Sequence, residues 1–181
     1  EANSPGRYSK RTVNFLSELD KTDAEMFSKL CGFGCVLGRP TILVFNHHDE
    51  IYVKNEITFA LLMHLESIGL INYHQLNQFN LSGYSDKFPV FYYGKTLVLT
   101  IPDGNPNHQF RLGKVLLTKL GEELAQVCDS EPVDGFLEYL KLKWQHYLPA
   151  TGQKDTTNNT SDTAALGIDE SPPATSPLVW L

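Results

Sequence analysis

The chain has 181 residues, of which 41% are hydrophobic and 20% are charged, and its formal net charge is −6. This composition is typical of a globular protein and excludes collagen-like, disulfide-rich and wholly disordered classes. No apolar run approaches the roughly 20 residues of a membrane-spanning helix, and no basic stretch followed by an apolar one marks a secretion signal. Because the chain begins with Glu1 and not with Met, we expect it to be part of a longer protein.

The cysteines indicate the compartment. Cys31, Cys35 and Cys128 make an odd set. Unpaired cysteines suit a reducing compartment, where they behave as small buried apolar residues. We therefore expect a cytoplasmic protein.

A change of composition divides the chain after Leu148. Residues 149–181 are rich in Thr, Ser, Asn, Asp, Gly and Pro, and residues 150–177 contain no aromatic side chain. Such a stretch buries too little apolar surface to offset its ordering entropy. We predict a folded domain over residues 1–148 and a flexible tail over residues 149–181. The apolar end of the tail, Pro177–Leu181, is either a short docking peptide or a chance feature.

Capping residues and apolar spacing predict the helices. Ser9 precedes one helix, and the capping box Thr22–Glu25 starts another that ends near Phe33. The clearest helix covers residues 57–68, where Phe59, Leu62, Leu65 and Ile68 share one expected core face. Further helices are expected after Thr118 and near Pro132.

The remaining apolar runs predict strands. A buried strand is expected over residues 41–45, followed by a polar loop over residues 46–55. Residues 88–93 and 96–101 read as a hairpin across Gly94 and Lys95, and a further strand is expected over residues 110–117. We predict an α+β, winged-helix-like domain in which this hairpin is the wing, residues 57–70 take the recognition-helix position, and a C-terminal helix follows.

Longer motifs resemble a bacterial family known as domain of unknown function 2806. The resembling stretches are residues 5–12, 23–27, 62–71, 92–95 and 113–124. The resemblance implies a winged-helix-like C-terminal half, a helical region upstream that this chain lacks, and a looser kinship with abortive-infection (phage-defence) proteins. It implies no catalytic residue, because the family has no established activity.

The sequence contains no enzyme signature that we identify. Cys31, Cys35, His47 and His48, with Asp49 and Glu50, come nearest to a metal cluster, but we interpret the two cysteines as core packing. The motifs Gly-x-Ser-x-Gly and Gly-x₄-Gly-Lys-Ser/Thr do not occur, and His64 and Ser67 lie on an apolar helix. We therefore expect a non-enzymatic protein without metal or cofactor.

Two functions remain open from the sequence. The first is a protein-interaction module of a larger bacterial protein, for which the resemblance suggests a role in phage defence. Such a module would contact a protein partner or the missing upstream region. The second is a nucleic-acid-binding winged-helix regulator, although residues 57–70 contain no Lys or Arg to neutralise phosphates. The expected contact residues in either case are Arg7, Lys10, Arg11, Tyr92, Tyr93 and Lys95.

Overall fold

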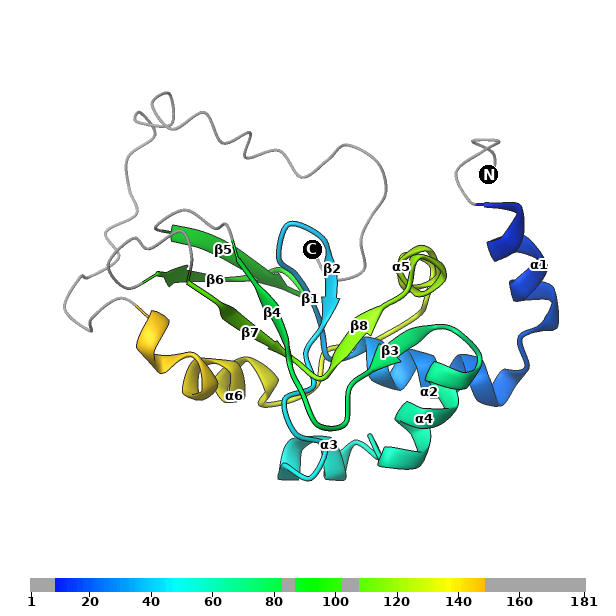
Figure 1. Cartoon of the computed structure of the whole chain (residues 1–181), viewed down its shortest axis with the longest axis horizontal. Coiled ribbons are helices and arrows are strands. Elements are labelled where there is room, and N and C mark those ends of the chain that lie inside the picture. The colour runs from blue at the N-terminus through cyan, green and yellow to red at the C-terminus, as the bar shows by residue number, and fades with distance from the viewer. Residues whose placement is uncertain (1–8, 83–86, 102–107, 149–181) are drawn as a thin grey trace.

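The computed structural model describes residues 9–82, 87–101 and 108–148 (Figure 1). The predicted tail and Arg7 lie outside these residues. The helices are α1 (Lys10–Glu18), α2 (Lys21–Cys31), α3 (Glu50–Lys54), α4 (Phe59–Ser67), α5 (Lys119–Ala125) and α6 (Phe136–Lys143), followed by a 3₁₀ turn at Gln145–Tyr147. Over the described ranges, no helix combines the length and apolar character needed to cross a membrane.

Side-chain caps fix where most helices begin. Ser9 caps α1, as predicted, and Thr118 caps α5 by accepting a hydrogen bond from the Gly121 N–H. The predicted capping box at Thr22 is wrong, because Asp20 caps α2 and accepts from the Asp23 N–H at 2.8 Å. The cap at Asp20 starts the helix two residues earlier than predicted, so Thr22 lies inside it.

The strands form three antiparallel groups. They are β1 (Gly34–Val36), β2 (Pro40–Ile42), β3 (Ile71–Tyr73), β4 (Phe79–Leu81), β5 (Lys87–Tyr92), β6 (Lys95–Thr100), β7 (Phe110–Gly113) and β8 (Val115–Leu117). One sheet has the order β2-β1-β5-β6, and the pairs β3-β8 and β4-β7 make the other two. The α+β class is therefore confirmed.

The predicted hairpin exists, but it is not a free-standing wing. Its strand β5 pairs with β1 at Val36 and Phe91, so the hairpin completes a four-stranded sheet. The turn is Tyr93-Gly94, one residue earlier than predicted, and both residues have positive φ. A two-residue turn of this kind favours glycine at its second position, and this preference sets the register.

Three further segments differ from the prediction. The expected polar loop over residues 46–55 contains α3. The expected strand over residues 110–117 divides into β7 and β8 at Gly113, whose φ of 108° few other residues adopt. Helix α6 begins after Gly135, so Pro132 precedes its first turn.

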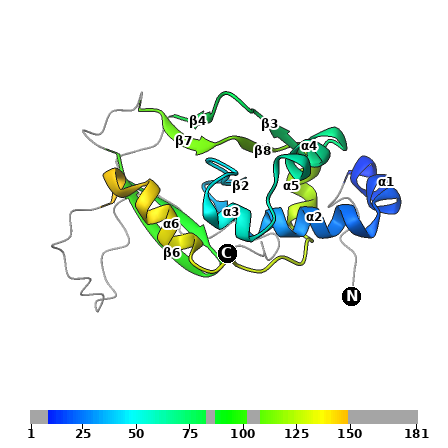
Figure 2. The same cartoon turned by 90° about the horizontal axis from the view of Figure 1, so that it is seen from below.

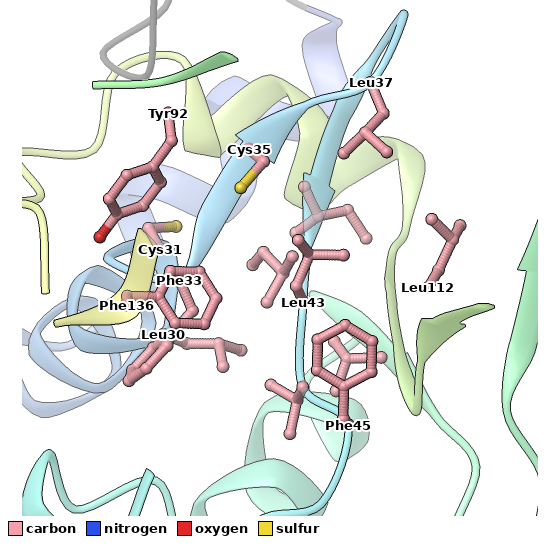
Figure 3. Packing of buried hydrophobic residues seen from close by; sticks show 14 of the residues in the cluster. Leu30, Cys31, Phe33, Cys35, Leu37, Leu43, Phe45, Tyr92, Leu112 and Phe136 are labelled. Carbon is pink, nitrogen blue, oxygen red and sulfur yellow. The ribbon is translucent and has the colours of Figure 1, made fainter. Parts of the chain in front are cut away.

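The core lies between the strand layers and the helices. Figure 2 shows the pairs β4-β7 and β3-β8 on one side of the molecule and α6 with β6 on the other. Large aromatic side chains fill the centre, and five of them are among the most deeply buried: Trp144, Tyr52, Phe33, Phe110 and Phe136. Figure 3 shows Phe33 and Phe136 packed beside Leu30 and Cys31 at the end of α2.

Two glycines allow backbone segments to touch. A Cβ atom at Gly121 in α5 would lie 2.1 Å from the carbonyl oxygen of Leu70, just before β3. A Cβ atom at Gly113 would lie 2.5 Å from the carbonyl oxygen of Val44. Atoms do not approach this closely without a shift of the chain. Glycine at these positions therefore lets α5 and the β7–β8 junction pack directly on neighbouring backbone.

Candidate functional site

Aromatic side chains from three segments meet at the surface near the start of α4. His47 lies 6.0 Å from Phe59 and 6.3 Å from Tyr73 between ring centroids, and Phe59 lies 6.1 Å from Tyr73. The His48 ring lies 4.0 Å from the His47 ring between centroids and is tilted by 40° against it. We call this cluster, together with Met63, Gln75 and Leu76, the aromatic patch.

The sequence of α4 divides its side chains between the core and the aromatic patch. Thr58 starts the helix by accepting a hydrogen bond from the Leu61 N–H at 3.2 Å. Leu61, Leu62 and Leu65 are buried, whereas Phe59 remains 44% exposed. The expected placement of Phe59 in the core is therefore wrong. Its aromatic ring lies with His47 and Tyr73 instead.

The chain after β3 extends the aromatic patch. The Gln75 side chain donates from Nε2 to the Sδ atom of Met63 at 3.5 Å. Lys114 Nζ donates to the carbonyl oxygen of Gln75 at 2.8 Å, which holds this segment against the β7–β8 junction. Leu76, the next residue, is 94% exposed. The contacts of Gln75 thus fix the position of this segment, while the apolar side chain of Leu76 remains in solvent.

The centre of the aromatic patch is uncharged at neutral pH. Burial, then the nearby His48 and Lys114, lower the pKa of His47, so its ring is neutral at pH 7. Burial, with a smaller contribution from Glu66, raises the pKa of the Tyr73 hydroxyl. The Tyr73 hydroxyl and His47 Nδ1 lie 3.2 Å apart and form a neutral hydrogen bond.

Asp49 anchors the loop that carries the two histidines. Its Oδ2 atom accepts from the Tyr139 hydroxyl at 2.6 Å and from Lys143 Nζ at 2.9 Å, both on α6. Its Oδ1 atom accepts from Asn46 Nδ2 at 2.9 Å. Burial acts to raise the pKa of Asp49, but these hydrogen bonds outweigh it and the net pKa is lowered. The carboxylate therefore fixes the histidine loop to the last helix.

The predicted contact residues fall into two groups on different elements. Lys10 and Arg11 are exposed in the first turn of α1. Tyr92, Tyr93 and Lys95 surround the hairpin turn, and Figures 1 and 2 show α1 at one end of the molecule with strands β5 and β6 toward the other.

The two tyrosines point inward, and only Lys95 of the hairpin group is exposed. Tyr92 is 2% exposed, and its hydroxyl donates to the Gly32 carbonyl oxygen at 3.0 Å. The Tyr93 hydroxyl donates to the Cys31 carbonyl oxygen at 3.3 Å. Tyr93 is half-buried, and both hydroxyls bind backbone near the end of α2, so the contact role expected of the two tyrosines stays a prediction.

The residues weighed as metal ligands do not converge. Cys31 ends α2, Cys35 lies in β1, and His47 belongs to the aromatic patch. Within the part of the chain that the structure describes, no three His, Cys, Asp or Glu side chains are placed to share a metal ion.

His64 and Ser67 make local structural contacts. His64 Nε2 lies 2.6 Å from Asp23 Oδ1, which links α4 to α2. Ser67 donates to the His64 carbonyl oxygen at 2.7 Å within the same helix. The two side chains therefore bind different groups and do not form a nucleophile–base pair.

Sequence reasoning did not identify the aromatic patch. Phe59 and Met63 are four residues apart on α4 and therefore share a face. That spacing is a usable signal, but it overlaps the leucine spacing that fills the core. His47 and Tyr73 are distant in the sequence, and only the fold brings them together.

A family model described as "Protein of unknown function (DUF2806)" matches residues 1–141. The match covers most of the chain, and the protein therefore belongs to this family. No curated protein and no solved structure matches the chain.

Proposed function

We propose that this member of the DUF2806 family is a protein-interaction module and that the aromatic patch is its contact surface. One observation carries the proposal: Phe59 and Leu76 are 44% and 94% exposed, and the neutral side chains of His47, Tyr73 and Met63 lie in the same patch. The centres of protein interfaces are enriched in aromatic residues and Met and depleted of charged residues. The aromatic patch has this composition.

The support of the aromatic patch also favours binding. Asp49 and Lys114 hold its two loops by hydrogen bonds, and α4 supplies Phe59 and Met63 from a regular element. A surface held in place before binding loses less conformational entropy when a partner docks. Burial of Phe59 and Leu76 would then supply most of the binding energy, as anchor residues commonly do.

A photo-crosslinking residue at position 76 tests the proposal. In the native cell, p-benzoylphenylalanine at Leu76 is expected to give an adduct with one defined protein. The matched control is the same residue at Leu142 of α6, which is 71% exposed and lies between two lysines. The adduct at position 76 should disappear in the Phe59→Ser variant. Equal adducts at both positions, or none at position 76, would contradict the proposal.

The alternative function is nucleic-acid binding, and one arrangement favours it. Lys10 and Arg11 begin α1. Hydrogen bonds from Thr12 and Ser9 lower the pKa of Glu123 on α5, and the nearby Lys119 adds a smaller contribution. Glu123 in turn accepts from the Thr12 hydroxyl of α1 at 2.5 Å. These contacts hold the first turn of α1, which carries Lys10 and Arg11, against α5, which carries Lys119.

A mobility-shift titration with pooled duplex DNA and RNA at several salt concentrations tests this alternative. Phosphate contacts predict binding that weakens steeply with salt. Such binding, reduced in a Lys10→Ala/Arg11→Ala variant and unchanged in Phe59→Ser, would favour the alternative over the aromatic patch. A role in phage defence stays a prediction that follows from the resemblance.

A further inference from the structure

Two cysteine thiols meet at the junction of α2 and the segment after α5. Cys31 is the last residue of α2, and Cys128 follows α5 by three residues. The two thiols lie close enough together for each to shift the pKa of the other. Ser28, one turn before Cys31, places its Oγ atom 3.3 Å from the Cys128 sulfur. Residues 100 positions apart in the sequence therefore meet in one thiol–hydroxyl cluster.

Ser130 and Tyr93 complete this cluster. The Ser130 hydroxyl, two residues after Cys128, lies 2.7 Å from the Tyr93 hydroxyl and helps to lower the pKa of the Cys128 thiol. Tyr93 also donates to the carbonyl oxygen of Cys31. The two sulfur atoms are thus held in place by side chains from α2, from the hairpin turn and from the chain after α5.

An open groove reaches the cluster from solvent. The groove has a volume of about 1020 Å³, and its lining includes Ser28, Asp129 and Ser130. Ser28 contacts the Cys128 sulfur directly, and Asp129 and Ser130 follow Cys128 in the chain. Cys128 is partly exposed, whereas Cys31 and Cys35 are buried. Of the three cysteines, Cys128 is therefore the one that solvent can reach, and the groove lies beside it.

The environments of the three thiols agree with this difference in access. The neighbouring Cys31 thiol is the main cause that lowers the pKa of Cys128 to about 7, with smaller contributions from Ser28 and Ser130. Burial raises the pKa of Cys31 and of Cys35. At neutral pH Cys128 is therefore the nucleophile of the set, and Cys31 holds its proton.

We propose that Cys128 is a site of oxidation by peroxides and that Cys31 resolves the product to an intramolecular disulfide. The Cys128 thiolate attacks one peroxide oxygen, the O–O bond breaks, and the departing oxygen takes a proton and leaves as water or an alcohol. The sulfur is oxidised to a sulfenic acid and the peroxide is reduced. The Cys31 sulfur then attacks the Cys128 sulfur, its proton passes to the departing oxygen, and the S–O bond breaks as water leaves.

The proposed disulfide would join distant parts of the fold. It would tie the end of α2 to the segment that leads from α5 to α6. The Tyr93 contact lies on the Cys31 carbonyl group, so the change would also reach the hairpin turn. This inference is independent of the aromatic patch, which involves other residues.

Peptide mapping of the intact chain under non-reducing conditions tests the proposal without any substitution. After treatment with one equivalent of hydrogen peroxide, we expect a loss of about 2 Da and a peptide pair that joins Cys31 to Cys128. Before oxidation, iodoacetamide at pH 7 should modify Cys128 at least tenfold faster than Cys35. A bond that involves Cys35, a disulfide between two chains, or equal alkylation of all cysteines would overturn the proposal.

Single substitutions separate the two steps. Cys31→Ala should stop the reaction at the sulfenic acid, which dimedone traps as an adduct on Cys128. Cys35→Ala, a substitution of the other buried cysteine, should oxidise as the unaltered chain does. Cys128→Ser should lose no mass on treatment with peroxide. Disulfide formation in the Cys128→Ser variant, or no dimedone adduct in a folded Cys31→Ala variant, would contradict the assigned roles.

Discussion

The two sides of helix α4 show how one element serves the core and the surface differently. On the inner side, Leu61, Leu62 and Leu65 are buried beside β3. On the outer side, Phe59 and Met63 join the aromatic patch, where apolar groups remain in contact with water. Apolar character alone does not tell these two groups apart. The difference shows that the inner leucines stabilise the fold, whereas the outer residues are available for binding.

Truncation of one leucine from each region should separate them most clearly. Leu65→Ala leaves a cavity in the core and is expected to lower the free energy of unfolding by about 2–5 kcal/mol. Leu76→Ala removes a side chain that is already in water, so we expect a change within about 0.5 kcal/mol. Urea unfolding followed by circular dichroism measures both. A large cost at Leu76 would show that the aromatic patch belongs to the core.

Substitution of a glycine that packs against backbone should give the next largest loss of stability. In Gly121→Ala, the new Cβ atom would clash with the Leu70 carbonyl group, and we expect a cost of about 3 kcal/mol. Gly135→Ala is the matched control. Gly135 has a φ of 76° but open space around its Cα, so only backbone strain of about 1 kcal/mol applies. Equal costs in thermal unfolding would contradict the close contact of α5 with the chain before β3.

A substitution of Asp49 tests how firmly the loop that carries His47 and His48 is held. Asp49→Ala removes the acceptor of Tyr139, Lys143 and Asn46, and we expect a loss of about 1–3 kcal/mol. The folded-state pKa of Asp49 is lowered, so its contribution is present above the ordinary value of 3.8 and is lost as the pH falls through the folded value.

Unfolding midpoints measured between pH 7 and pH 3 check this prediction. Glu50→Ala is the control, because the Glu50 carboxylate is fully exposed and pairs with Lys54 in the same helix. It should leave the midpoint at pH 7 unchanged. If Asp49→Ala also leaves it unchanged, Asp49 does not anchor the loop.

The smallest expected effect is the change of stability with pH that results from the protonation of His47 in the aromatic patch. His47 has a lowered pKa, so the unfolded chain binds a proton near pH 6.5 while the folded chain does not yet bind one. Stability should therefore fall as the pH drops from 6.5 toward the folded value, and His47→Gln should lack this slope. A ring titration by NMR should place the midpoint of His47 below 6.5. A midpoint above 6.5 would mean that the ring is not desolvated by its neighbours.

The sequence predicted the elements whose signals are local. Ser9 and Thr118 cap helices as expected, because a cap depends on residues three positions away. The hairpin was predicted with a shift of one residue, because the alternation of β5 and β6 is visible in the chain and Gly94 marks the turn.

Features that depend on distant residues could not be predicted. Nothing near the hairpin indicates that β1 pairs with β5, so the hairpin was assigned as a wing. Helix α3 is short, and Asp49 stabilises its start from contacts on α6 and not from its own sequence. The thiol cluster and the aromatic patch likewise combine segments that are far apart in the chain.

The pairing of β3 with β8 has a consequence for the rate of folding. Ile71 and Leu117 are register partners, yet the whole β4–β7 segment lies between them in the chain. Closing a long loop costs conformational entropy before the new contacts compensate for it. We expect local contacts to form first. Helix α4 and the β5-β6 hairpin should form early, and the β3-β8 ladder should close late. A short turn in place of residues 74–114 would shorten that loop, but it would also remove two strands from the sheet that contains β1.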